Sequence, residues 1–275
     1  MKKRRIRWKN VILLFVFILF LIIFIYSLIQ VVKWNFDSKK TKDEISEINE
    51  TTMIKEIEDN DNTEILGEED MDESNPYWDY IKMNLIDVDF NDLKIKNKNT
   101  VGWINVNGTN INYPYVQYKD NNYYLTHSFD NSYSDAGWVY LDYRNNPSSF
   151  DKNNIIYAHG RMDKTMFGSL RKILTNGWLD DINNYVVRMS NERENTLWQV
   201  FSVYRIPTTN DYIKVSFNND EEYSNFIDLI VNRSQYDFNT YVGIKDKILT
   251  LSTCYNDDEK VVLHAKLIKR EIKSH

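Results

Sequence analysis

Cys254 is the only cysteine in the 275-residue sequence, and it follows the apolar run Ile248–Thr253. A single thiol cannot form a disulfide within the chain, so it is either a nucleophile or an inert core residue. A nucleophilic thiol needs a base that takes its proton and an acid that returns a proton to a leaving amine. Imidazole can do both, so a histidine is the expected partner of the thiol.

Four histidines could serve the thiol. His127 lies in a predicted loop, His264 lies inside a predicted strand, and His275 ends the chain. His159 differs because it ends the apolar run 155–158 and precedes a glycine. A residue at the point where a buried strand opens into a loop is held rigidly and still reaches solvent, which suits proton transfer. We predict His159 as the partner of the thiol, with a structural, hydrogen-bonded imidazole as the alternative.

The N-terminal residues indicate where this chemistry takes place. Residues 1–10 form a basic tail with six Lys and Arg, and residues 11–33 are almost entirely apolar. A helix of about 20 apolar residues spans a bilayer, whereas a cleaved signal peptide has a shorter apolar region and small residues at its cleavage site. We therefore predict an uncleaved transmembrane anchor, with the N-terminus cytoplasmic and the remaining chain extracellular.

Residues 34–75 are rich in Asp, Glu, Asn and Lys. Such a segment buries too little apolar surface to offset its ordering entropy, so we expect an acidic flexible stalk. Isoleucines spaced at three in 45–48 and 54–57 leave a transient helix or a short coiled coil as the alternative. The like-charge block 67–73 favours the linker.

Residues 76–275 are aromatic-rich and long enough, at about 200 residues, for one domain with its own core. Many short β-branched and aromatic segments alternate with turn signals, and helices are predicted from Asn75 to Leu85, over 166–174 and over 220–231. The pattern predicts a mainly β barrel or sandwich with peripheral helices. Strands are expected at 101–106, 110–116, 136–141, 154–158, 185–189, 196–205, 247–252 and 261–268. The net charge of −6 argues against nucleic acid as a partner.

Two motifs resemble one family. Thr250-Leu251-Ser252-Thr253-Cys254 matches the Thr-Leu-x-Thr-Cys signature of sortases, and residues 154–159 with 165–170 resemble the histidine segment of the class B branch. The likeness covers Trp78 to Lys273. It implies an eight-stranded sortase-type β-barrel with an N-terminal helix and peripheral helices, preceded by the transmembrane helix. It implies no cofactor, and the acids at 257–259 lack the ligand spacing of a metal site.

The resemblance also implies an activity, that of a cysteine transpeptidase of Gram-positive cell surfaces. Cys254 would attack the carbonyl after Thr in an Asn-Pro-x-Thr-x sorting motif, and His159 would transfer the protons. The partners would be surface proteins with C-terminal sorting signals, an amine of the peptidoglycan cross-bridge or its precursor, and the lipid bilayer around the anchor.

Further site residues follow from the same resemblance. The backbone N–H of Tyr255 would be an oxyanion donor. Substrate-groove positions are implied at Ser252, Thr208, Tyr212, Ile213 and Leu125, and helix 220–231 would be the long helix of class B.

One position departs from the family. Sortases carry an arginine where this chain has Lys260, after a loop that is shorter than usual. Lysine keeps the charge but lacks the planar fork of arginine, so Arg144 or Arg161 could act in its place. The lysine and the short loop motivate one alternative to an active enzyme, a low-activity module that binds sorting motifs. A separate alternative is an unrelated membrane-anchored β-domain whose cysteine is merely buried.

Overall fold

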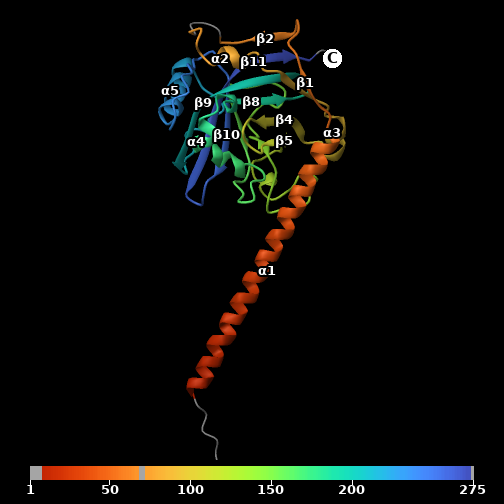
Figure 1. Cartoon of the computed structure of the whole chain (residues 1–275), viewed down its shortest axis with the longest axis vertical. Coiled ribbons are helices and arrows are strands. Elements are labelled where there is room, and N and C mark those ends of the chain that lie inside the picture. The colour runs from red at the N-terminus through yellow and green to blue at the C-terminus, as the bar shows by residue number, and fades with distance from the viewer. Residues whose placement is uncertain (1–7, 68–71, 274–275) are drawn as a thin grey trace, which may run out of the picture.

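The computed structural model describes residues 8–67 and 72–273. Eight strands form a closed barrel in the order β10-β7-β6-β5-β4-β8-β9-β11, and β11 pairs back with β10. The structure confirms the predicted eight-stranded barrel (Figure 1). The barrel strands are β4 (Thr100–Val106), β5 (Asn112–Val116), β6 (Tyr140–Leu141), β7 (Asn153–Tyr157), β8 (Val186–Ser190), β9 (Glu194–Pro207), β10 (Ile248–Cys254) and β11 (Glu259–Ile272).

Large aromatic and aliphatic side chains fill the core of the domain. Trp103, Trp138 and Trp198 are fully buried. In β10 every residue before Cys254 is buried, including the polar Thr250, Ser252 and Thr253. β10 runs parallel to β7 and antiparallel to β11, so both of its edges are hydrogen-bonded and its last residue is held firmly.

Short helices surround the barrel. α5 (Asp220–Asn232) packs Tyr223, Phe226, Ile227 and Ile230 against a second apolar cluster that includes residues of β9. The cap of α5 is Asn219, one residue before the predicted Asp220. The predicted helix from Asn75 is a single turn, and the one over 166–174 is a 3-10 helix. The other helices in the described part of the chain are α2 (Tyr77–Tyr80), α3 (Asn91–Lys96), α4 (Asn176–Leu179), η1 (Tyr123–Leu125), η2 (Gly168–Leu174) and η3 (Ile182–Asn184).

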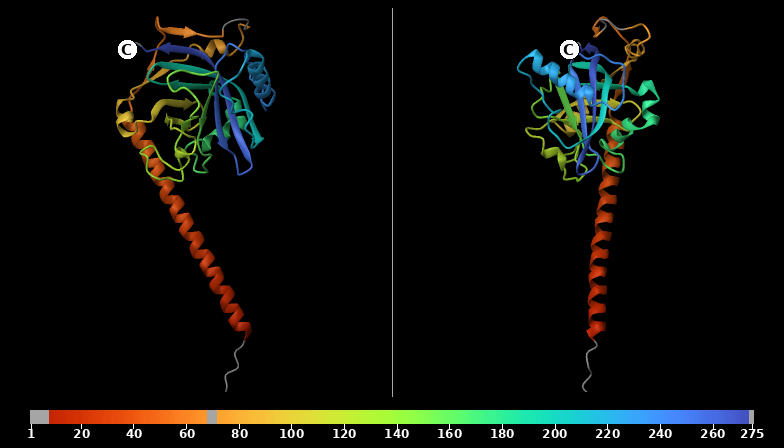
Figure 2. Two further views of the ribbon diagram at one scale, coloured as in Figure 1. Left: turned by 180° about the vertical axis from the view of Figure 1, so that it is seen from behind. Right: turned by 90° about the vertical axis from the view of Figure 1, so that its left-hand side faces the viewer.

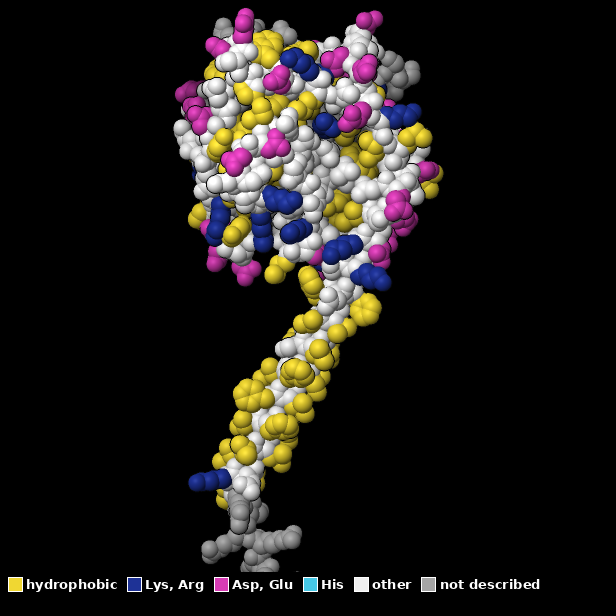
Figure 3. Space-filling view, in the orientation of Figure 1, with side chains coloured by type: hydrophobic (Ala, Val, Ile, Leu, Met, Phe, Trp, Pro, Cys, Tyr) yellow, Lys and Arg dark blue, Asp and Glu magenta, His cyan; other side chains and the backbone are white. Residues whose placement is uncertain are grey.

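The N-terminal helix α1 (Trp8–Thr51) contains the apolar run and leaves the barrel as a long rod (Figures 1 and 2). Its most apolar 18-residue window has a mean hydropathy of 3.3 and no buried residue, and it is long enough to cross a membrane. Figure 3 shows the apolar side chains covering the visible face of this rod. Residues 1–7 of the predicted basic tail lie outside the described residues.

Residues 34–67 differ from the predicted flexible stalk. α1 continues to Thr51, and Ser38, Thr41, Glu44 and Ile48 are buried against the domain. After it, β1 (Ile54–Ile57) pairs with β3 (Leu85–Val88), and β2 (Thr63–Ile65) pairs with β11. Residues 68–71, within the like-charge block, lie outside the described residues.

The correction has a physical reason. A helix is costly to nucleate and cheap to extend, and the apolar part of α1 already supplies the nucleus for residues 34–51. The four buried residues recur at every third or fourth position and therefore share one helix face. Polar partners on the domain complete the contact: Arg161 pairs with Asp37 at 3.0 Å, and Lys96 pairs with Glu47 at 3.0 Å.

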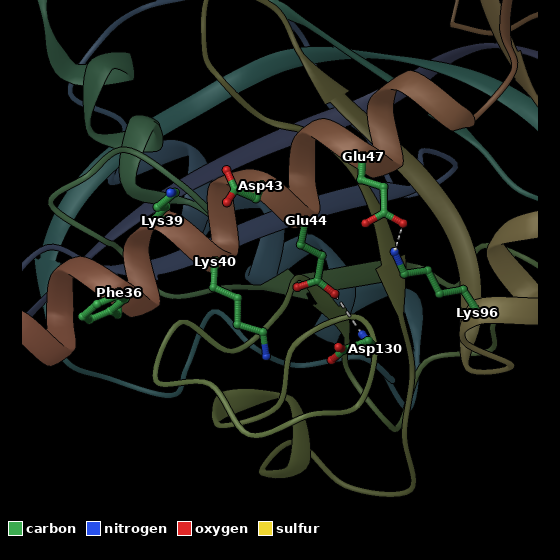
Figure 4. Close-up of a pocket in the computed structure, with 8 residues that line it drawn as sticks. All are labelled: Phe36, Lys39, Lys40, Asp43, Glu44, Glu47, Lys96 and Asp130. Atoms are coloured by element: carbon green, nitrogen blue, oxygen red, sulfur yellow. Dashed lines mark hydrogen bonds and ion pairs between the residues drawn. The ribbon is translucent and has the colours of Figure 1, made fainter.

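A cavity of about 430 Å³ lies where α1 meets the domain (Figure 4). Its charges are mixed, and Glu44 accepts a hydrogen bond from the Asp130 backbone N–H at 3.0 Å. Burial and then the charge of Asp130 raise the pKa of Glu44. The cavity therefore belongs to the docking contact. Its lining residues are Phe36, Lys39, Lys40, Asp43, Glu44, Glu47, Lys96 and Asp130.

The packing of α1 against the domain can be tested by substituting Ile48, whose side chain is 2% exposed. Ile48→Ala is expected to lower the free energy of unfolding by about 2–4 kcal/mol, since it leaves a cavity in the core. Thermal unfolding of the full chain in detergent micelles measures the change, with Met53→Ala as the exposed control. Equal stability of the two variants would show that α1 does not dock.

The buried imidazole of His264 makes stability depend on pH. It lies between Tyr204 Oη at 2.7 Å and Thr250 Oγ1 at 2.9 Å. Burial, with a smaller effect of Arg233, lowers the pKa of His264 to about 3, whereas an unfolded histidine titrates near 6.5.

Below pH 6.5 His264 binds a proton in the unfolded chain, whereas it stays neutral in the folded chain until the pH approaches 3. Its contribution to stability is therefore complete above pH 6.5 and falls as the pH drops, by up to about 1.4 kcal/mol per pH unit. Thermal unfolding at pH 7.5 and pH 5 should show a smaller drop for His264→Gln than for the unsubstituted chain. An identical drop in both would contradict this role.

Candidate active site

Cys254 is the last residue of β10, and it is exposed although the six residues before it are buried. A four-residue turn, 255–258, leads into β11, and the antiparallel register sets Lys260 directly opposite Cys254. Lys260 Nζ donates to Cys254 Sγ at 2.9 Å. An ammonium group in this position can stabilise negative charge on the sulfur or on an oxygen that forms beside it.

His159 lies at the neighbouring strand end. In the parallel pairing of β7 with β10, Tyr157 is opposite Ser252, so two residues further His159 comes level with Cys254. Thr253 Oγ1 donates to the Ala158 carbonyl at 2.8 Å and joins the two strand ends. Thus the structure brings together the two residues that the sequence predicted as a pair.

Hydrogen bonding fixes the orientation of the His159 ring. Nε2 lies 2.8 Å from the Leu125 carbonyl oxygen. A carbonyl only accepts, so Nε2 carries the proton and Nδ1 of the neutral ring is free to accept one. Leu125, predicted from the resemblance as a substrate contact, thus contacts His159 through its backbone. Gly137 has φ +58°, and a Cβ there would lie 2.9 Å from the Leu125 oxygen, so only glycine suits this position.

The two alternative arginines are bound to carboxylates. Arg144 pairs with Asp142, and its Nη2 also donates to the Ile213 carbonyl at 2.9 Å. Burial alone would raise the pKa of Asp142, but hydrogen bonds from Arg144 outweigh it and lower the pKa. Arg161 pairs with Asp37 and Asp163, each at 3.0 Å. Of the three predicted cations, Lys260 is thus the one placed at the sulfur.

The Tyr255 backbone N–H does not fit the predicted oxyanion role in this conformation. It donates to the Glu259 carbonyl at 2.8 Å. The physical reason is the short loop: the four residues 255–258 connect β10 to β11, and the Tyr255 N–H closes this hairpin, so it is not available to a substrate. The role requires the turn to open.

The predicted substrate positions lie around the same strand ends, but two of them are buried. Tyr212 Oη and Ser252 Oγ share a buried hydrogen bond of 2.9 Å. Thr208 donates through its backbone N–H and its hydroxyl to the Asp258 carbonyl at 2.8 and 3.1 Å, which ties it to the turn after Cys254. Ile213 is half-buried beside Arg144. In this conformation Ser252 and Tyr212 support the site from beneath rather than lining it.

Sequence reasoning missed three contributors: Tyr140, Gly160 and Arg171. Burial raises the pKa of Tyr140, and the charges of Asp142 and then Cys254 add to the shift. A Cβ on Gly160 would lie 2.0 Å from the Cys254 carbonyl oxygen. Arg171 donates to backbone carbonyls on both sides of the site. Only the glycine left a signal, as the residue following His159.

Among residues 8–67 and 72–273, no group of three His, Cys, Asp or Glu side chains is arranged to hold a metal ion. The site consists of a thiol at a strand end, an imidazole level with it on the neighbouring strand end and an ammonium group hydrogen-bonded to the sulfur.

Comparisons with known proteins point to one family. The Sortase domain family matches residues 104–268. Sortase B of Staphylococcus aureus is 35% identical over 184 residues, which are 66% of this chain and 75% of that protein. The solved S. aureus sortase B–substrate complex has a TM-score of 0.61 at 35% identity and covers 66% of this chain and 84% of its own. Sortase B of B. anthracis in complex with AAEK1 reaches 0.67 at 32% identity, over 85% and 99%.

The closed barrel and the cysteine at its strand end thus define a cysteine transpeptidase, and the chain belongs to the sortase family. Within that family it falls in the class B branch, because these relatives are sortases B.

Proposed function

We propose that the chain cleaves an Asn-Pro-x-Thr-x type sorting motif after Thr and joins the released carbonyl to an amine of peptidoglycan or its precursor. The observation that carries the proposal is the 2.9 Å contact between Lys260 Nζ and Cys254 Sγ, level with His159. One relative was solved as a sortase B–substrate complex, which supports a peptide groove at this strand end.

The chemistry proceeds in two acyl transfers. The Cys254 thiolate attacks the Thr carbonyl carbon, the C–N bond breaks, and protonated His159 gives its proton to the departing amine. The product is a thioester on Cys254. Neutral His159 then takes a proton from the incoming amine as that amine attacks the thioester, and the thiolate leaves.

Lys260 is proposed as the oxyanion donor for both steps. Its Nζ is already beside the sulfur, and an ammonium group that turns toward the carbonyl oxygen stabilises the charge that develops there. The Tyr255 N–H joins it only when its bond to Glu259 breaks. A lysine at the position of the family arginine and a Tyr255 N–H that is already bonded to Glu259 also favour the second candidate, a low-activity module that binds sorting motifs.

The same proposal extends to the membrane. We propose residues 11–33 as the membrane span, with the N-terminus cytoplasmic, and residues 76–275 as an extracellular catalytic domain on which residues 34–66 dock. The β10–β11 turn lies at the end of the domain from which α1 departs, in all views of Figures 1 and 2. This arrangement points the thiol toward the bilayer surface, where a membrane-held sorting signal would arrive.

The test uses the full chain in detergent micelles with a quenched Asn-Pro-x-Thr-x peptide and triglycine as the amine. Cleavage together with a peptide–triglycine product, both lost in Cys254→Ala, supports the transpeptidase. Peptide binding without cleavage supports the binding module. Neither binding nor cleavage of any peptide in a library varied at the fourth and fifth positions would overturn both.

A further inference from the structure

Arg171 joins the two segments that hold the predicted catalytic pair. It projects from η2, and its Nη2 donates to the Gly160 carbonyl at 3.0 Å and to the Tyr255 carbonyl at 2.6 Å. Gly160 follows His159, and Tyr255 follows Cys254. One guanidinium nitrogen therefore ties together the residues immediately after the base and the nucleophile.

The ring of Tyr255 strengthens this connection. The Arg205 guanidinium lies 3.7 Å from the ring centroid, and the Arg171 guanidinium lies 5.1 Å from it. Arg205 also pairs with Glu259, the first residue of β11. Cation–π attraction to two guanidinium groups holds the first residue of the turn, while the ion pair holds the residue that follows the turn.

The contacts of Arg171 are directed at backbone rather than at a carboxylate. Among the described residues its Nε is buried and has no hydrogen-bond partner, so Nη2 binds the two carbonyls while one donor of the same guanidinium stays unpaired. The backbone hydrogen bonding between β7 and β10 ends at Tyr157 and Ser252, before the chain reaches these two carbonyls. Removing the guanidinium would release the loop after His159 from the turn after Cys254.

We propose that Arg171 is a positioning residue of the sortase reaction, which holds His159 level with Cys254 by binding the carbonyls of Gly160 and Tyr255. The inference rests on the proposed roles of His159 and Cys254. Proton transfer between the two requires their geometry to be kept within a fraction of an ångström, and a shift of about 1 Å can cost a hundredfold in rate.

The test compares Arg171→Met and Arg171→Lys with Lys172→Met, which removes a neighbouring cation of the same helix. In the full chain, Arg171→Met should lower kcat for the sorting peptide at least tenfold and change KM less than twofold, with the melting temperature near that of the control. Arg171→Lys, whose ammonium can reach one of the carbonyls, should recover part of kcat. Lys172→Met should retain full activity.

A second readout needs no peptide. Alkylation of Cys254 by iodoacetamide at pH 7 should slow at least threefold in Arg171→Met, because the imidazole no longer assists the thiol, and should be unchanged in Lys172→Met. A folded Arg171→Met with unchanged kcat and unchanged alkylation would overturn the proposal. If the unsubstituted chain cleaves no sorting peptide, the proposed motif fails, while the alkylation rates still decide the role of Arg171.

Discussion

Gly160→Ala is expected to reduce kcat/KM for the sorting peptide by about 100-fold or more. A Cβ at this position would lie 2.0 Å from the Cys254 carbonyl oxygen and 3.0 Å from Thr253 Oγ1. The nearer atom is backbone in a central strand, so the added methyl must displace either the end of β10 or the loop after His159. Either shift separates the base from the nucleophile by about the distance that costs a hundredfold in rate.

Gly177→Ala is the matched control for this experiment, because a Cβ on Gly177 meets no atom within 4 Å. Peptide cleavage and thermal unfolding are measured on both variants. We expect Gly177→Ala to be fully active, and Gly160→Ala to be folded and nearly inactive. Activity of Gly160→Ala within threefold of the unsubstituted chain would show that the two strand ends move freely.

Lys260→Ala is expected to lower kcat/KM about 100-fold, the effect of losing one oxyanion donor. Lys260 Nζ donates directly to Cys254 Sγ, whereas Arg144 and Arg161 are paired with carboxylates, so neither is free to replace it. Lys260→Arg should preserve or raise turnover, since the planar guanidinium can hold two acceptors at once.

Lys172→Ala serves as the charge control for Lys260, and cleavage of the quenched peptide is again the measurement. A Lys260→Ala variant indistinguishable from the unsubstituted chain would mean that Lys260 is not the functional equivalent of the family arginine. The binding-module alternative would then gain support if both the unsubstituted chain and Lys260→Ala turned over the peptide slowly.

Much of the barrel could be predicted because its strands carry strong local signals. Ile248, Leu249 and Leu251 mark β10 as a buried strand, and the apolar stripe of α5 repeats at helical spacing. These patterns depend on nearby residues alone. The predicted helix from Asn75 and the strand over 136–141 shortened in the structure, since tertiary contacts rather than local propensity decide where such elements end.

The stalk shows where composition misleads. Charged residues at 34–51 indicated a solvated linker, yet their partners lie far along the chain, with Asp37 pairing Arg161 and Glu47 pairing Lys96. A polar segment can order when a preceding helix nucleates it and a distant surface supplies opposite charges. Neither condition can be read from the segment itself.

The residues alone predicted a mainly β domain, the lone thiol at a strand end and the histidine at another, because strand ends and residue types are local properties; the barrel itself was implied by the resemblance to sortases. Only the tertiary structure decided which groups meet there. In the folded domain Lys260 donates a hydrogen bond to the Cys254 sulfur, and Arg171 donates to the Gly160 and Tyr255 carbonyls. The Tyr255 N–H donates to the Glu259 carbonyl across the turn. Such contacts depend on strand register and on how the barrel closes, and these follow from packing across the whole domain.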